Sequence, residues 1–348
     1  MPEAGSTTLH PGLRGRIIDC LAKRTRLAPG PSAREGRGPI DGPRIPNLDR
    51  QADMFTKRRN DGTYIKDLPY FTRMLPYIMP SRTESAIYFE QDFDVTKALA
   101  YVRAANAAGS PGTKRLTLFQ VVLCAAVRTI ALRPKLNRFI AGLRYYRRNR
   151  IVFNFVAKKE LTDGGEEINV TLPFSPYETL STLPPKVSDY VSRLKRGEAT
   201  DTDDLNAFLA RLPRFVNRIV IGALFFLDYH NALPFSFIKG MPFFATIFFT
   251  NVGSVGIDAP FHHNFEFGTC GLFVAIGKIR REKAVDATGQ AVERDLVKVT
   301  FTYDDRIADG IYCGRAIDLL RSLVEDPSAL ERPPELSPEL LAELALAE

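Results

Sequence analysis

The sequence predicts an α+β protein built as a two-layer sandwich, in which helices cover a mixed β-sheet. Helix and strand signals alternate over residues 51–325. This body shows no repeated strand–helix–strand unit, and no strand leads into the glycine-rich turn that a doubly wound nucleotide fold requires. The chain has 348 residues, 45% hydrophobic and 25% charged, which is enough apolar material for a large core.

Four helices and four strands are predicted within the body. Asp94 or Thr96 can cap the first helix, and Pro134 stops the second. Polar turns at residues 163–165 and 286–290 separate the strands of two predicted strand pairs. The predicted helices cover residues 97–108, 116–132, 189–195 and 311–323, and the predicted strands cover residues 151–157, 168–172, 272–279 and 295–303.

Both ends of the chain differ in composition from this body. Residues 1–50 hold seven Gly and seven Pro, with nine Lys or Arg against five Asp or Glu, which predicts a flexible basic extension. Within it, residues 13–27 have the spacing of a short basic amphipathic helix, typical of a solvated tail or of a segment that docks on a membrane or a partner. Residues 326–348 form an acidic tail, in which Ser337 and Pro338 predict the start of a short helix.

Composition also argues against several classes of protein. The net charge is +7, but aromatic and basic residues do not interleave and no helix-turn-helix or zinc-knuckle pattern occurs, so no nucleic-acid partner is expected. The four cysteines show no C-x-x-C spacing, which predicts neither a disulfide framework nor a metal site. No cleavable signal peptide is visible. These features favour a cytoplasmic protein, with attachment to the periphery of a membrane as an alternative.

Four segments carry motifs that occur in the same order in a known protein family. Together they span roughly residues 85–325. They are residues 115–119 leading to 133–137, then 249–256, 272–277 and 304–310. In these segments the chain resembles the acyltransferase family that includes the catalytic domain of dihydrolipoyl acyltransferases and chloramphenicol acetyltransferase.

The resemblance implies a chloramphenicol acetyltransferase-like sandwich that assembles as a homotrimer or a larger oligomer, with its active site in a channel between subunits. It implies transfer of an acyl group from a coenzyme A thioester, with no covalently bound cofactor. In the family, the residue at the position of Thr250 donates a hydrogen bond to the oxyanion. Residues 304–310 correspond to the family's active-site signature and are termed the signature loop, and the residue at Asp309 orients this loop by ion pairing. Arg306 is expected to join that ion-pair network.

The signature itself departs from the family at one position. The family has D-H-R-x-x-D-G, whereas this chain has Asp305 where the catalytic histidine belongs. A carboxylate with a pKa of about 4 is a poor base for a thiol with a pKa of about 8.5. The replacement is therefore expected to remove most general-base catalysis, which contributes a factor of about 10² to 10⁴ to the rate. Three alternatives follow: an inactive scaffold or assembly protein, an enzyme with a rewired site, and an enzyme that uses Asp305 as its base.

His262 and His263 are the candidates for a rewired site, because paired imidazoles can supply a base near neutral pH or bind a metal. The alternative is that both histidines fill space beside the neighbouring aromatic residues. Asn251, together with Arg147 and Arg148, is the candidate for binding the coenzyme, although exposed hairpin arginines are common without a ligand.

Residues 205–249 read as a hydrophobic insertion, because the equivalent stretch of the family is shorter and polar. Residues 219–227 are apolar without interruption, which is about half the length of a membrane-spanning helix. Arg211, Arg214 and Arg218 precede them. The segment predicts either an oligomer or core contact, or a surface for a bilayer or a long acyl chain, as in a membrane-peripheral lipid acyltransferase.

Overall fold

The computed structural model describes residues 59–109, 114–158, 162, 165, 167–196, 209, 211–285 and 288–346. These residues belong to one compact unit. The predicted basic extension of residues 1–50, including the helix at 13–27, lies outside the described residues.

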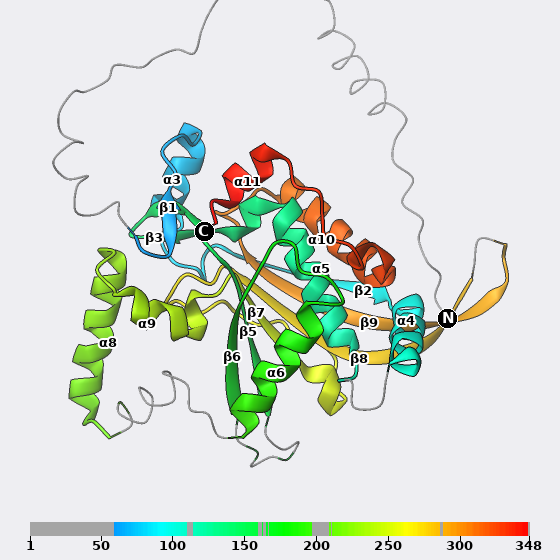
Figure 1. Ribbon diagram of the computed structural model, residues 1–348. Coiled ribbons are helices and arrows are strands. Elements are labelled where there is room, and N and C mark those ends of the chain that lie inside the picture. The colour runs from blue at the N-terminus through cyan, green and yellow to red at the C-terminus, as the bar shows by residue number, and fades with distance from the viewer. Residues whose placement is uncertain are drawn as a thin grey trace, which may run out of the picture. The chain divides into compact units, whose positions relative to one another are not determined.

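A six-stranded mixed sheet forms the centre of this unit (Figure 1). Its strands lie in the order β2-β9-β8-β7-β5-β6. Strand β7 pairs in parallel with β5 and with β8, whereas the other pairs are antiparallel. The strands are β2 (Ala86–Asp94), β5 (Ile151–Lys158), β6 (Glu167–Phe174), β7 (Ile247–Asn251), β8 (Leu272–Val285) and β9 (Ala291–Asp304).

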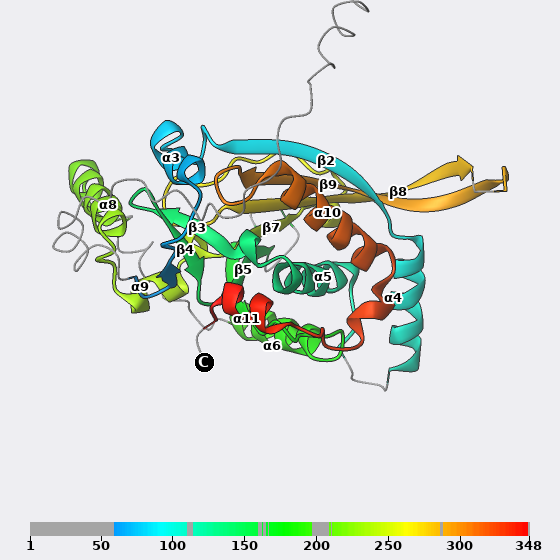
Figure 2. The same cartoon turned by 90° about the horizontal axis from the view of Figure 1, so that it is seen from above.

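Helices cover one face of this sheet, so the predicted α+β two-layer sandwich is confirmed (Figure 2). The central helix α5 (Leu118–Leu132) begins at a capping box, in which Thr117 and Gln120 satisfy each other's backbone N–H groups. It ends where Pro134 opens the 3₁₀ turn η1 (Pro134–Asn137). The other helices of the layer are α4 (Thr96–Ala108), α6 (Leu183–Lys195) and α10 (Gly310–Glu325).

The predicted elements are present, and several are longer than predicted. Strand β8 continues to Val285 and β9 begins at Ala291, so the two form a ribbon whose outer half extends beyond the pairing with β2 (Figure 2). Helix α6 begins at Leu183, because Pro184 and Pro185 stand in its first turn, where proline is tolerated.

The opposite face of the sheet carries no helix among the described residues. Side chains alternate along a strand, so Phe248 on β7 and Phe273 on β8 point away from α5 and form a second, smaller core. The coil of residues 256–271 covers this core through Phe265 and Cys270.

The acidic C-terminal segment packs on the same body. Leu330 in η4 (Pro327–Leu330) and Leu344 in α11 (Pro338–Leu344) are fully buried in the main core. Glu343 forms ion pairs with Arg138 and with Arg147. The predicted cap of this helix is observed, since the Ser337 hydroxyl accepts a hydrogen bond from a backbone N–H of its first turn.

Residues 211–249 do not form one hydrophobic unit. They form two helices, α8 (Arg214–Tyr229) and α9 (Phe235–Gly240), and then enter β7. Ile247 and Phe249 are therefore part of the central sheet and not of an insertion. No helix within the described residues is long and apolar enough to cross a membrane.

A second, three-stranded sheet is joined through Arg148 to the segments that precede β7 and β8. This sheet contains β1 (Gly62–Tyr64), β4 (Arg144–Arg148) and β3 (Arg138–Ala141). The buried Arg148 guanidinium donates hydrogen bonds to the carbonyl oxygens of Phe244 and Thr269, at 2.7 and 3.0 Å. It also lies 3.7 Å from the Asp61 carboxylate, and its desolvation lowers its pKa to about 10.

Replacing Arg148 with Met is expected to lower the free energy of unfolding by about 3–5 kcal/mol, because it leaves buried carbonyl oxygens unpaired and weakens the charge balance at Asp61. Urea unfolding followed by circular dichroism measures this change. Arg144→Met, in the same strand but only partly buried, serves as the control. Equal unfolding midpoints for the two variants would contradict this role of Arg148.

Candidate active site

The signature loop is held by a buried ion pair between two of its own residues. The Arg306 guanidinium contacts both carboxylate oxygens of Asp304, with Nε–Oδ1 at 2.8 Å and Nη2–Oδ2 at 2.6 Å. Its Nη1 donates to the carbonyl oxygens of Met79 and Pro80, which follow helix α3 (Tyr70–Ile78). Arg306 therefore joins the end of β9 to a segment more than two hundred residues earlier in the chain.

Asp309 caps a helix, so its predicted role in an ion pair with Arg306 is wrong. Its carboxylate accepts a hydrogen bond from the backbone N–H of Tyr312, at 2.9 Å, in the first turn of α10. Arg306 turns back to Asp304, two residues away, which leaves Asp309 to satisfy the free N–H groups of the helix. Both residues still shape the loop, through different contacts.

Asp305 is the acidic residue of the loop whose carboxylate is left unengaged. Its backbone N–H donates to the Ser85 carbonyl oxygen at 2.8 Å, which fixes the main chain. Within the described part of the chain, its side chain has no hydrogen bond or ion pair. Partial burial raises the pKa of Asp305, and the nearby charges of Asp304 and Asp309 raise it further. The structure thus presents a partly exposed carboxylate with a raised pKa, at the position where the sequence resemblance predicts the catalytic residue.

Thr250 lies on β7, away from Asp305. The register pairs Thr250 with Ala275 on β8, and Ala275 with Thr300 on β9. Asp305 is five residues beyond Thr300, or roughly 17 Å along an extended strand. One copy of the chain therefore does not bring the predicted oxyanion donor and Asp305 together.

His262 and His263 lie on the face of the sheet opposite α5. The His262 ring stacks on Phe273 with 3.9 Å between ring centroids, and the two imidazoles stack on each other at 4.8 Å. Each Nδ1 faces the carbonyl oxygen of the next residue, at 2.7 Å for His262 and 3.0 Å for His263, so each Nδ1 is the donor. Partial burial lowers the pKa of His262.

These contacts match the space-filling alternative for the two histidines. No hydrogen bond joins either imidazole to Asp305 or to Thr250 in the described ranges. No cluster of His, Cys, Asp or Glu suited to a metal is found among those residues either. The structure does not bring the rewired site together within one copy.

Neither arginine predicted to bind the coenzyme is placed to do so. Arg148 is buried against the segments that precede β7 and β8, and Arg147 pairs with Glu343, with 2.7 Å between Nη2 and Oε2. Because side chains alternate along β4, these two adjacent arginines point to opposite faces of the small sheet. Other parts of the protein cover both faces.

A cleft at the N-terminal end of α5 was not predicted as a unit from the sequence. It consists of two adjoining hollows of about 540 and 410 Å³. Asn251, Thr117, Phe119 and Ser254 line both, so Asn251 does lie where a ligand could reach it. Its amide makes no hydrogen bond within the described segments, although its backbone carbonyl accepts one from Ser254 at 2.8 Å.

Basic side chains surround this cleft. They come from the coil before α5, the end of β5, the last turn of α6 and β8, and they are Lys114, Arg115, Lys158, Lys195 and Lys278. The lining includes no acidic residue. Because these cations are far apart in sequence, only the fold shows that they share one cleft. The polar and cationic lining suits a phosphate-bearing ligand.

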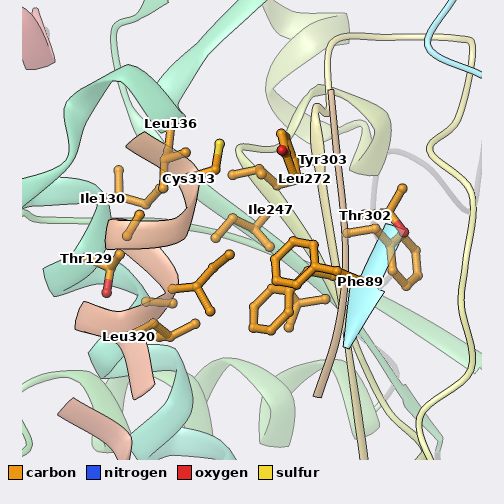
Figure 3. Close-up of a pocket in the computed structure, with 16 residues that line it drawn as sticks. Phe89, Thr129, Ile130, Leu136, Ile247, Leu272, Thr302, Tyr303, Cys313 and Leu320 are labelled. Atoms are coloured by element: carbon orange, nitrogen blue, oxygen red, sulfur yellow. The ribbon is translucent and has the colours of Figure 1, made fainter. Parts of the chain in front are cut away.

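A small apolar cavity of about 50 Å³ lies between α5, α10 and the sheet (Figure 3). Ile130, Leu136 and Cys313 face Ile247 and Tyr303 across it (Figure 3). Burial raises the pKa of the Cys313 thiol to about 12, so this cysteine is a packing residue and not a nucleophile. The cavity has room for about one or two water molecules and offers almost no polar partner.

Part of the chain matches the model of a known protein family. Residues 245–331, which include Thr250 and the whole signature loop, match the family model of the 2-oxoacid dehydrogenases acyltransferase catalytic domain. The resemblance inferred from the sequence motifs is thereby confirmed. Among curated proteins, no sequence matches the chain.

Solved structures share the fold at low sequence identity. A probable dihydrolipoamide acetyltransferase from Listeria monocytogenes has a TM-score of 0.52 and 14% identity, covering 76% of this chain and 98% of its own. The cubic core of a pyruvate dehydrogenase multienzyme complex has a TM-score of 0.49 and 16% identity, covering 83% and 99%. A chloramphenicol acetyltransferase has a TM-score of 0.42 and 12% identity, covering 76% and 98%. The first of these supports the chloramphenicol acetyltransferase-like fold.

Asp305→Asn is expected to stabilise the protein slightly at neutral pH. A carboxyl whose pKa is raised by folding contributes stability below its unfolded pKa and loses it as the pH rises through the folded pKa. At neutral pH the ionised Asp305 is repelled by Asp304 and Asp309, and removing its charge gains a few tenths of a kcal/mol, since the group is only partly buried.

Thermal unfolding at several pH values measures this gain, which should shrink as the pH approaches about 4. The control is Asp318→Asn, an exposed acid of α10 that pairs with Arg321. A gain for the Asp305 variant that grows on acidification would show that its pKa is not raised.

Proposed function

We propose that the protein transfers an acyl group from a coenzyme A-type thioester to an acceptor thiol. The observation that carries this proposal is the unengaged carboxylate of Asp305. The side chains of Asp304 and Arg306 hold the loop, and that of Asp309 caps the start of α10. Asp305 is instead held by its backbone N–H alone. A loop that served only to stabilise the fold would gain nothing from a partly buried, unpaired acid.

The cleft beside α5 is the proposed site for the thioester carrier. Its two hollows, of about 540 and 410 Å³, leave room for a pantetheine arm, and its rim of lysines suits the phosphates of a nucleotide. Asn251 lies where the hollows meet, at the end of β7. Its free amide can donate to, or accept from, an amide group of the arm.

The reaction requires residues from two copies of the chain. Asp305 of one copy accepts the proton of the acceptor thiol, and the thiolate attacks the thioester carbonyl. The hydroxyl of Thr250 from a neighbouring copy donates to the oxyanion that forms. Collapse of this intermediate expels the thiolate of the carrier, which takes the proton back from Asp305. A homotrimer, as in the resembled family, is the assembly that we propose for this site.

The raised pKa of Asp305 assists this chemistry. It narrows the difference in pKa between the carboxyl group and a thiol with a pKa of about 8.5, although an imidazole would remain the stronger base. We therefore expect a slow enzyme, whose rate of acyl transfer is about 10² to 10⁴ below that of a relative with a catalytic histidine.

A non-catalytic scaffold is the second candidate function. It is favoured by the absence of an imidazole from the loop and by the packing of His262 and His263 against Phe273 and each other. In that case the loop keeps its shape through Asp304 and Arg306, and the protein binds partners without turnover.

Incubation with labelled acetyl and long-chain acyl coenzyme A distinguishes the two functions. We expect Asp305→Asn to slow loss of the thioester at least about 100-fold while acyl coenzyme A still binds. Asp318→Asn, on the exposed side of α10, should react like the unaltered protein. Turnover that is unchanged in Asp305→Asn would eliminate Asp305 as the base. Binding without turnover, with turnover gained in Asp305→His, would establish the scaffold.

Charge reversal in the cleft tests where the carrier binds. Lys195→Glu and Lys278→Glu should each weaken coenzyme A binding about tenfold at low salt, and less at high salt, because each removes a cation facing the ligand phosphates. Lys283→Glu, on the β8–β9 ribbon outside the cleft, is the matched control. Calorimetric titration measures the affinities, and equal values for all three variants would place the carrier elsewhere.

A further inference from the structure

Helix α8 stands apart from the body of the protein. It has 16 residues, none of which is buried, and it lies at the edge of the molecule (Figure 1). Leu224 and Leu227 attach it to the small apolar cluster around α9. Asp228 fixes its C-terminal end through an ion pair with Arg59 at 2.8 Å. One side of the helix is thus held to the body while the other faces outward.

The outward side of α8 is strongly apolar. Phe215, Ile219 and Phe226 are 68, 67 and 63% exposed, and Tyr229 is also exposed. Their spacing of four, seven and three residues places them along one side of a helix, roughly opposite Leu224 and Leu227. These four residues are termed the outer face of α8. Such exposure in a soluble domain marks a surface that something else covers.

Within the described part of the chain, the unpaired charges of α8 and of the turn before it are positive. Arg211, Arg214 and Arg218 are exposed and form no ion pair within the described residues. The acidic residue between positions 211 and 240 is Asp228, and Arg59 already neutralises it. Within the described residues, the outer face therefore combines exposed aromatic groups with cations that no carboxylate balances.

Helix α3 presents a second apolar surface at the same end of the molecule. Both α3 and α8 lie beyond the small sheet in each of two perpendicular views (Figures 1 and 2). The exposed side chains of α3 are Tyr70, Phe71, Met74, Tyr77 and Ile78. Tyrosine combines an apolar ring with a polar hydroxyl, which suits the boundary between lipid and water.

We infer that this end of the protein docks on an anionic membrane surface through the outer face of α8. Aromatic side chains enter the boundary between headgroups and acyl chains, while Arg211, Arg214 and Arg218 contact lipid phosphates. The attachment is peripheral, because no described helix is long and apolar enough to cross a bilayer.

A second copy of the chain fits the same surface less well. In a twofold contact the patch meets itself, and the described residues of this patch include arginines but no free carboxylate to pair with them. A pair of 16-residue helices is also only about 24 Å long, too short to bury the area of a stable dimer interface by itself. An anionic surface satisfies both the apolar groups and the charges.

Vesicle flotation with the full chain tests this inference independently of any acyl transfer. The unaltered protein should float with vesicles of phosphatidylcholine and phosphatidylglycerol in equal parts, and not with phosphatidylcholine alone. Arg214→Gln with Arg218→Gln should weaken binding about 30-fold. Phe215→Ser with Phe226→Ser should weaken it at least about tenfold. Circular dichroism should show that both double variants remain folded.

Matched substitutions at the far end of the molecule control for general charge and hydrophobicity. Arg103→Gln on α4 and Val285→Ser on the β8–β9 ribbon should float like the unaltered protein. Failure to float with anionic vesicles would overturn the inference, as would flotation that the α8 substitutions leave unchanged. So would a smaller particle mass for Phe215→Ser with Phe226→Ser, measured by light scattering, if vesicle binding stayed the same; that result would assign the outer face to self-association.

Discussion

The candidate site depends on the buried ion pair between Asp304 and Arg306. Two opposite charges removed from water are stable only when each keeps its partner and its remaining hydrogen bonds. Arg306 meets this requirement by binding Asp304 and the backbone of Met79 and Pro80 together. The pair therefore fixes the shape of the loop without using Asp305. The same contacts join the end of β9 to the chain after α3, so the loop cannot shift without disturbing the edge of the sheet.

The register of the central sheet sets the second constraint. Strand β7 pairs in parallel with its two neighbours, and the order of pairing separates Thr250 from Asp305 by five residues along β9. A strand is too stiff to close that gap within one copy. An acyl-transfer site that uses both residues must lie between copies. The Asp304–Arg306 pair would then matter for assembly as well as for the position of Asp305.

Locally determined features could be predicted from the sequence. The limits of α5 follow from Thr117, Gln120 and Pro134, which act within one turn of the helix. The cap of α11 by Ser337 is equally local. The role of Asp309 was missed, because the same acid can cap a helix or pair with Arg306, and only the direction taken by the Arg306 side chain decides.

Features that depend on distant segments could not be predicted. Arg147 and Arg148 form a basic cluster in the sequence, but pairing with β1 and β3 turns one inward and gives the other to Glu343. The cleft beside α5 gathers cations from four separate elements. The hydrophobic segment before β7 was visible in the sequence, whereas the outward direction of Phe215 and Phe226 required the structure.

A subunit-mixing experiment tests the shared site most directly. Thr250→Val and Asp305→Asn each remove one half of the site, and each variant alone should lack acyl transfer. When the two are unfolded together and refolded as a mixture, some contacts between copies regain an intact Asp305 and an intact Thr250. We expect about a quarter of the original activity to return in a randomly mixed ring, because each contact has a chance of about one in four of combining both intact residues. If the mixture stays as inactive as its parents while the unaltered protein regains activity after the same treatment, the site does not lie between copies.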